Sequence, residues 1–208
     1  MTTPQALLAF VAAASLLTIT PGLDTALVLR TLTVEGPRRA MLAATGIGLG
    51  CLVWGAAVGL GLGALLAASR LAYDALRFAG AVYLLVLGIR LIRAPRAQLE
   101  LAGQAEMARA PNWLARGFLT NMLNPKIGVF YVSFLPQFIP AGSSVPLWSL
   151  LLTAIHAALG LGWFGLLVLA SRPVLGALQR PAVVTWLDRL TGGLFVGFGL
   201  KLALSARG

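Results

Sequence analysis

Acidic residues, cysteine and histidine are all scarce in this chain. Of its 208 residues, six are Asp or Glu, one is Cys and one is His. A single cysteine excludes a disulfide within the chain, and one histidine with scattered carboxylates offers no ligand cluster or catalytic triad. We therefore expect neither an enzyme nor a metal or other cofactor. Cys51 lies in an apolar run and is interpreted as a small packing residue.

Charged residues of both signs together are too few for a soluble domain. They make up 11% of the chain, whereas 59% is hydrophobic and the mean hydropathy is +0.89. A soluble protein of this length needs far more polar surface. The composition predicts an all-α membrane protein that crosses the bilayer several times.

Six apolar stretches are long enough to cross a membrane, for which about 20 residues are needed. They cover residues 5–29, 40–68, 73–92, 114–139, 147–171 and 183–204. The last is the weakest, because Asp188, Arg189 and Lys201 leave it a short uncharged middle, and a five-span version also fits. The first stretch has no basic region before it, so we interpret it as a retained helix rather than a cleaved signal.

Basic residues outside these stretches gather on one side of the membrane. Eleven follow the first, third or fifth span: Arg30, Arg38, Arg39, Arg90, Arg93, Arg96, Arg109, Arg116, Arg172, Arg180 and Arg189. Four fall on the other side: Arg70, Arg77, Lys201 and Arg207. The positive-inside rule places the larger group in the cytoplasm and both termini outside. Topology thus explains the net charge of +10, and no nucleic-acid partner is expected.

Two proline breaks interrupt the first and fourth stretches. Their sequences are Thr20-Pro21-Gly22-Leu23-Asp24 and Asn121-Met122-Leu123-Asn124-Pro125-Lys126. Because proline has no amide proton, Pro21 frees the carbonyl of Leu17 and Pro125 that of Asn121. In hydrocarbon such groups persist only beside protein or a wet cavity. Paired interruptions of this kind indicate the binding site of a transporter.

Three spans separate the two breaks, so the second half must be inserted upside down relative to the first. The sequence predicts two inverted three-helix repeats with broken helices 1 and 4, at residues 1–93 and 114–208, joined by a hydrophilic cytoplasmic connector at 94–113. Glycines spaced by four allow close helix contacts within the fold or between the protomers of a homodimer. They are Gly46 and Gly50; Gly55, Gly59 and Gly63; and Gly193 and Gly197.

Each break is also predicted to begin a half-helix. Thr20 and Asn124 are the expected N-caps, with Pro21 and Pro125 at the first helical position. Unpaired amides and the positive end of a helix dipole would then favour a carboxylate. Asp24 suits such a first turn, whereas Lys126 is opposed by the dipole unless an anion lies close.

Charged side chains at this depth are expensive, which makes a functional role the default for Asp24 and Lys126 and mutual pairing the cheapest arrangement. The alternatives are an acid that only stabilises a helix end and a lysine that snorkels to the interface. Asp24 is also the predicted proton-coupling residue. The predicted substrate-binding residues are Thr20, Pro21, Gly22, Asp24, Asn121, Asn124, Pro125 and Lys126.

Segments in a fixed order carry a family resemblance. Besides the first break, they are Gly46-Ile47-Gly48-Leu49-Gly50, Phe78-Ala79-Gly80-Ala81-Val82-Tyr83-Leu84, the run 117–126 and Phe134-Leu135-Pro136-Gln137-Phe138. Together they resemble the LysE/RhtB family of bacterial amino-acid exporters, over nearly the whole chain. The resemblance implies a bacterial inner-membrane protein that exports amino acids or their derivatives by proton antiport. Its expected partners are a small-molecule amino-acid substrate and membrane lipid.

Three further residues are second-tier candidates. Trp54 stands where many members of the threonine/homoserine branch carry a histidine, so we expect it to fill space or line the pathway; Leu23 replaces a second proline. His156 has three open roles: relaying protons, contacting substrate or making one interhelical hydrogen bond. Arg77 could guide an anion or anchor the interface. A passive channel and a structural or assembly protein remain alternatives to an exporter.

Overall fold

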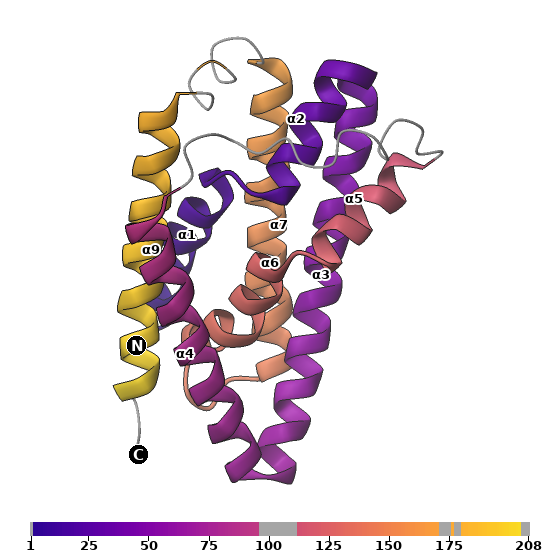
Figure 1. The fold of residues 1–208 in the computed structure, drawn as a ribbon. Helices are drawn as coiled ribbons and strands as arrows, with labels where there is room; N and C mark the ends of the chain where they lie inside the picture. Colours follow the sequence, from indigo (N-terminus) through magenta and orange to yellow (C-terminus); the bar gives the residue numbers. More distant parts are fainter. Residues whose placement is uncertain (1, 96–111, 171–175, 177–179, 205–208) are drawn as a thin grey trace.

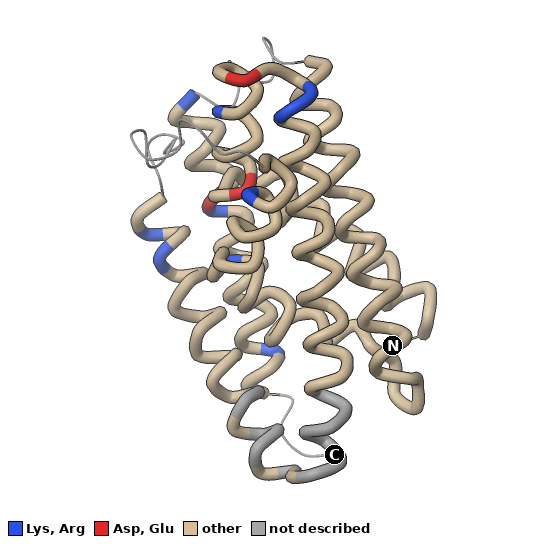
Figure 2. The backbone as a smooth tube through the Cα atoms, turned by 90° about the vertical axis from the view of Figure 1, so that its right-hand side faces the viewer, with Lys and Arg blue, Asp and Glu red and all other residues tan. Residues whose placement is uncertain are grey.

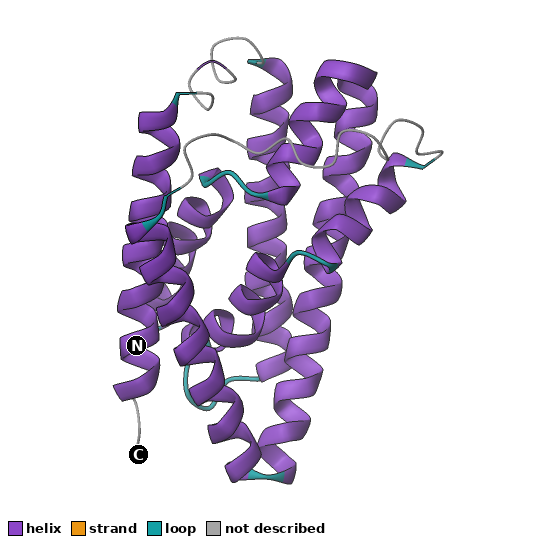
Figure 3. Cartoon of the chain, viewed as in Figure 1, coloured by secondary structure: helices purple, strands orange, loops and turns teal. Residues whose placement is uncertain are grey.

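The structure is a computed structural model that describes residues 2–95, 112–170, 176 and 180–204; the side chains at 62–68, 70, 72–74, 76 and 77 are not described. Residues 96–111, most of the predicted connector, lie outside this part. The described residues form helices and no strands (Figure 3). The helices are α1 (Thr3–Ile19), α2 (Leu23–Glu35), α3 (Pro37–Ala68), α4 (Arg70–Arg93), α5 (Trp113–Met122), α6 (Pro125–Val129), the π-helix η1 (Phe130–Phe134), the 3-10 helix η2 (Leu135–Phe138), α7 (Val145–Leu169) and α9 (Pro181–Leu204) (Figure 1).

Local sequence accounts for several helix boundaries. Gly36 has φ +89° and separates α2 from α3, a left-handed conformation that glycine adopts without strain. Asn112 caps α5 by accepting a hydrogen bond from the Ala115 amide at 3.0 Å. Pro146 lies in the first turn of α7, where a missing amide proton leaves no bond unmade.

Among the described residues, two helices are by themselves long and apolar enough to cross a membrane, at Pro37–Gly61 and Val145–Leu169. A third span is obtained if α1 and α2, which are bent by 50° at the first break, are taken as one. The structure therefore agrees with an all-α membrane protein whose first span is broken. The remaining three of the six predicted spans stay predictions.

Close helix packing depends on glycine at several crossings. A Cβ at Gly117 of α5 would collide with the Ala43 carbonyl of α3, and one at Gly46 would collide with the Leu114 carbonyl. α3 also packs along α7, and α4 packs along α9 (Figure 1). At the α4–α9 crossing a Cβ on Gly88 would lie 2.6 Å from the Gly192 carbonyl oxygen. The glycines thus let backbones approach without intervening side chains.

Two apolar cores meet at the level of the proline breaks. One contains the aromatic side chains Phe10, Phe130, Tyr131, Phe134 and Phe138, all essentially buried. The other contains Leu27 and Val28 of α2 with Ala43, Phe164 and Leu167 from α3 and α7. Four polar residues of the breaks, Thr20, Asp24, Asn121 and Asn124, are buried, so protein surrounds them.

Candidate functional site

The first break is a change of direction between two helices. α1 ends with Thr20 as its C-cap, whose amide donates to the Leu16 carbonyl at 3.1 Å and whose Oγ1 donates to the same carbonyl at 2.7 Å. Gly22 is the N-cap of α2, and Asp24 lies in its first turn as expected. The prediction that Thr20 is an N-cap with Pro21 at the first helical position is therefore wrong. The hydroxyl turns back onto α1 and closes that helix instead.

The second break begins a helix as predicted. Asn124 is the N-cap of α6, its Oδ1 accepts a hydrogen bond from the Lys126 amide at 3.1 Å, and Pro125 lies in the first turn. The helix that follows is nevertheless only five residues long and continues as the π-helix η1 and the 3-10 helix η2. A dipole of so short an α-helix contributes little, so the positive charge at this break comes mainly from Lys126.

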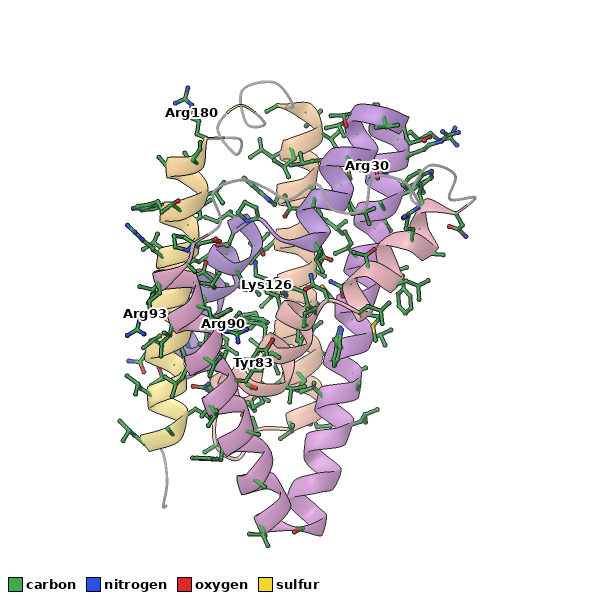
Figure 4. The ribbon with its side chains drawn as sticks, in the orientation of Figure 1. Arg30, Tyr83, Arg90, Arg93, Lys126 and Arg180 are labelled. Atoms are coloured by element: carbon green, nitrogen blue, oxygen red, sulfur yellow. The ribbon has the colours of Figure 1, made fainter. Side chains whose placement is uncertain are left out.

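The two breaks are tied together by side chains that cross from one to the other. Lys126 Nζ donates to the Leu17 carbonyl at 3.1 Å and to the Thr20 carbonyl at 2.9 Å. The Leu17 carbonyl is the group that Pro21 was predicted to free, and the ammonium satisfies it. Figure 4 shows Lys126 inside the bundle beside α6, whereas Arg93 and Arg180 lie at its edge.

This placement accounts for a lysine at a helix N-terminus. The two carbonyls that it contacts belong to the C-terminal turn of α1, where the helix dipole is negative. A cation is stabilised there and offsets the unfavourable position on α6.

Asp24 is held from the second break. Asn121 Nδ2 donates to Asp24 Oδ2 at 2.8 Å and to Cys51 Sγ at 3.5 Å. Asp24 is only 8% exposed, and its other oxygen, Oδ1, has no hydrogen-bond partner among the described residues. A buried carboxylate oxygen without a donor is unfavourable unless a water or a ligand supplies one.

A cavity of about 40 Å³ connects these groups, enough for a small number of water molecules. From the breaks it is lined by five of the predicted residues: Thr20, Gly22, Asp24, Asn124 and Lys126. Pro21, Asn121 and Pro125 are not among its lining residues; they shape the backbone or hold Asp24. The opposite wall comes from α3 and α7 and includes Cys51 and His156.

The second-tier candidates fall in different places. His156 lines the cavity, and its Nδ1 shares a hydrogen bond of 2.8 Å with the Tyr131 hydroxyl, which is the interhelical bond considered above. Trp54 does not line this cavity; its ring packs on Gly128, and it borders a separate hollow of about 350 Å³ with Tyr83 and Pro125. Arg77 belongs to α4, but its side chain lies outside the described part.

Two contacts and one buried carboxyl group were not anticipated from the sequence. Cys51 is buried as expected but also accepts from Asn121, and Thr191 of α9 shares a short hydrogen bond with Thr20. Asp188, which the sequence places near the end of a span, is fully buried. A carboxyl group inside an apolar stretch is itself a signal of function, so the position of Asp188 within residues 183–204 is the signal that could have singled it out.

The arrangement suits a zwitterion. The cavity exposes an acceptor of Asp24 and is bordered by the ammonium of Lys126, so one small molecule that carries both an ammonium and a carboxylate could contact both. The two protein charges lie on opposite breaks, which places the pair at the junction of the two halves of the chain.

Comparison with known proteins identifies the family. A family model described as LysE type translocator matches residues 15–206. The uncharacterized membrane protein YrhP of Bacillus subtilis is 30% identical over 97% of this chain and 100% of its own length. The leucine efflux protein of Klebsiella pneumoniae and the threonine efflux protein of Escherichia coli are each 28% identical, over 94% and 90% of this chain and 93% and 92% of their own lengths.

No solved structure matches the chain. The family match covers both breaks and both walls of the cavity, and it confirms the resemblance to bacterial amino-acid exporters. The chain therefore belongs to the LysE type translocator family and is a membrane transporter rather than an enzyme.

Proposed function

We propose that this translocator exports amino acids or small derivatives of them across the bacterial inner membrane by proton antiport, with the substrate held between the two breaks. The observation that carries the proposal is the cavity shared by Asp24 and Lys126, in which Asp24 Oδ1 has no partner among the described residues. The names of the leucine and threonine efflux relatives favour an amino acid as the substrate.

Charge exchange explains how such a substrate is held. The α-ammonium of an incoming amino acid contacts Asp24, and its carboxylate draws Lys126 away from the carbonyls of Leu17 and Thr20. Every buried charge keeps an opposite charge or a hydrogen bond throughout, which is required in a medium of low polarity. Protonation of Asp24 from the outer side then weakens the contact to the ammonium and couples release to the proton gradient.

We propose that the two halves of the chain are related by a two-fold axis, an arrangement that suits alternating access. The separation in sequence between Pro21 and Pro125 equals that between Gly88 and Gly192, the two glycines that meet at the α4–α9 crossing. Residues related by a two-fold axis between inverted repeats contact one another where that axis passes, as these glycines do. We propose that the two repeats exchange conformations around the breaks.

The basic residues favour the predicted orientation. Figure 2 shows most of the described Lys and Arg in the half of the bundle that contains the junction of α2 and α3. We place the basic end in the cytoplasm, with both termini outside.

We also propose a homodimer, on the basis of an exposed glycine face on α9. A Cβ at Gly193 or Gly197 of α9 would meet no atom within 4 Å, so this pair makes no close contact within the protomer, unlike Gly46 and Gly50. A second copy of α9 would fit against such a face.

Counterflow in proteoliposomes tests the export function. Vesicles loaded with unlabelled amino acids should take up the labelled counterparts with saturation, and Asp24→Asn and Lys126→Met should each lower the exchange by more than about tenfold, as expected for the loss of a buried charge contact. Saturable exchange also separates a carrier from a passive channel. Normal transport by Lys126→Met would overturn the charge-exchange mechanism, and an unchanged pH dependence in Asp24→Asn would exclude Asp24 as the coupling acid.

A further inference from the structure

The cavity has two chemically different ends. Beside the breaks it is polar, whereas six of the residues that α3 and α7 contribute to its wall are apolar. We call this part the apolar section; it consists of Ala44, Ile47 and Gly48 of α3 and Gly160, Leu161 and Phe164 of α7. None of these six side chains has a hydrogen-bonding group.

The apolar section has room because two of its members are glycines. A Cβ on Gly48 would lie 3.7 Å from the Leu161 side chain, an ordinary contact distance, and a Cβ on Gly160 would meet no atom within 4 Å. The flanking side chains of Ile47 and Phe164 are buried and fixed by their neighbours in the second apolar core. The section is therefore a firm apolar wall with open space beside it.

The polar end fixes how a ligand must lie. Asp24 Oδ1 and Thr18 Oγ1 border the cavity, are buried and have no hydrogen-bond partner among the described residues. An α-ammonium at Asp24 and an α-carboxylate at Lys126 occupy the break side of the cavity. The side chain of the same amino acid then extends toward α3 and α7, since the breaks fill the other direction.

We propose that the exported substrate is an α-amino acid with an aliphatic side chain, which packs against the apolar section while its charged α-groups are held at the breaks. The inference rests on the proposed function and names its substrate class. An aliphatic side chain gains from burial against these residues, whereas a hydroxyl, ammonium or carboxylate there would lose water without finding a partner.

Valine and threonine provide the most direct test, because they have the same shape and differ by one hydroxyl in place of a methyl group. Half-saturating concentrations for labelled valine and labelled threonine are measured by counterflow with the native protein, with lysine and glutamate as competitors. Valine should be favoured by at least about tenfold, the range typical of apolar pockets, and lysine and glutamate should not compete.

Two variants on α7 test whether the substrate side chain lies against the apolar section. Gly160→Leu places an aliphatic group where the substrate side chain is proposed to lie, so exchange of valine and leucine should be lost while exchange of alanine persists. Gly162→Leu is the matched control, because Gly162 is exposed on the same helix and lines a different hollow. Should Gly160→Leu fail to fold, Gly160→Ala adds a Cβ into open space and should still shift the preference toward smaller substrates.

The outcomes separate this inference from the proposed function. Exchange of amino acids with threonine or lysine preferred over valine, or an unaltered preference in both Gly160 variants, would overturn the aliphatic assignment and leave the exporter standing. No exchange of any amino acid would overturn both.

Discussion

At the residue scale, Lys126 is the side chain that joins the two halves of the site. Its ammonium contacts two carbonyls at the end of α1, one of which has lost its normal donor to Pro21. The sequence was sufficient to expect a functional lysine and a freed carbonyl, because both follow from local chemistry. Their contact could not be predicted, since it depends on how α1 and α6 meet in the folded chain.

Removing this ammonium should destabilise the fold as well as transport. Lys126→Met leaves the Leu17 carbonyl without its described donor, and an unsatisfied buried polar group costs about 1–3 kcal/mol. We expect a lower thermal unfolding temperature in detergent. Lys201→Met is the control, because Lys201 is exposed on α9 and the loss of its contact with the Phe198 ring should cost no more than about 1 kcal/mol. Equal stability of the two variants would contradict the bridging role.

The bond between Tyr131 and His156 gives a second prediction at this scale. Tyr131→Phe removes the hydroxyl that lies 2.8 Å from His156 Nδ1 and leaves the buried imidazole without that partner. The free energy of unfolding should fall by about 1–3 kcal/mol. Tyr83→Phe, at a position that is 39% exposed, should have no measurable effect in the same unfolding assay.

At the element scale, the two breaks differ in how far the sequence predicts them. Proline fixes both interruptions locally, and the cap at Asn124 follows from its position before Pro125. The roles of Thr20 and Gly22 at the first break are not encoded so simply, because a threonine hydroxyl can turn toward either neighbouring helix. In the π-helix at Phe130–Phe134, Phe130 contacts Phe10 of α1 and Phe134 contacts Phe198 of α9, and no local pattern reports such contacts between elements.

The seam between α3 and α7 provides a prediction about packing. A Cβ at Gly55 would overlap Thr153, so Gly55→Ala should lower the unfolding temperature, and Thr153→Ala should restore part of the loss. Gly61→Ala tests the same change where no atom lies within 4 Å, and its effect should be neutral or stabilising by up to about 1 kcal/mol. A destabilised Gly61→Ala would point to helix flexibility rather than to the seam.

At the scale of the whole molecule, the α3–α7 pair is tight at one end and looser at the other. Gly59 and Ser149 are in contact at the end away from the basic residues, whereas the cavity opens between the same helices nearer the basic end. The composition was enough to predict a bundle of apolar helices with basic residues on one side. The difference in packing between the two ends could not be predicted, because it depends on how α3 and α7 meet in this conformation and no sequence pattern encodes it.

Alternating access requires the tight end to separate during transport. Cysteines at Gly59 and Ser149, introduced together in a Cys51→Ala background, should cross-link under oxidation after a slight separation of the helices, because a Cβ at Gly59 would lie 2.9 Å from that of Ser149. The cross-link should stop exchange, and reduction should restore it. Each single substitution supplies a control for the effect of the thiols alone. Full activity of the cross-linked protein would show that this seam stays closed throughout the cycle.

The bonds from Lys126 to the carbonyls of Leu17 and Thr20 also bear on affinity. In the proposed mechanism a substrate carboxylate does not meet a solvated cation without partners but must displace the two carbonyls that Lys126 already contacts. Part of its binding free energy is used in that displacement, so the equilibrium affinity is weaker than the contacts alone would give. Weak binding would let the carrier stay mostly empty at ordinary metabolite levels and carry flux only when its substrate accumulates in the cell.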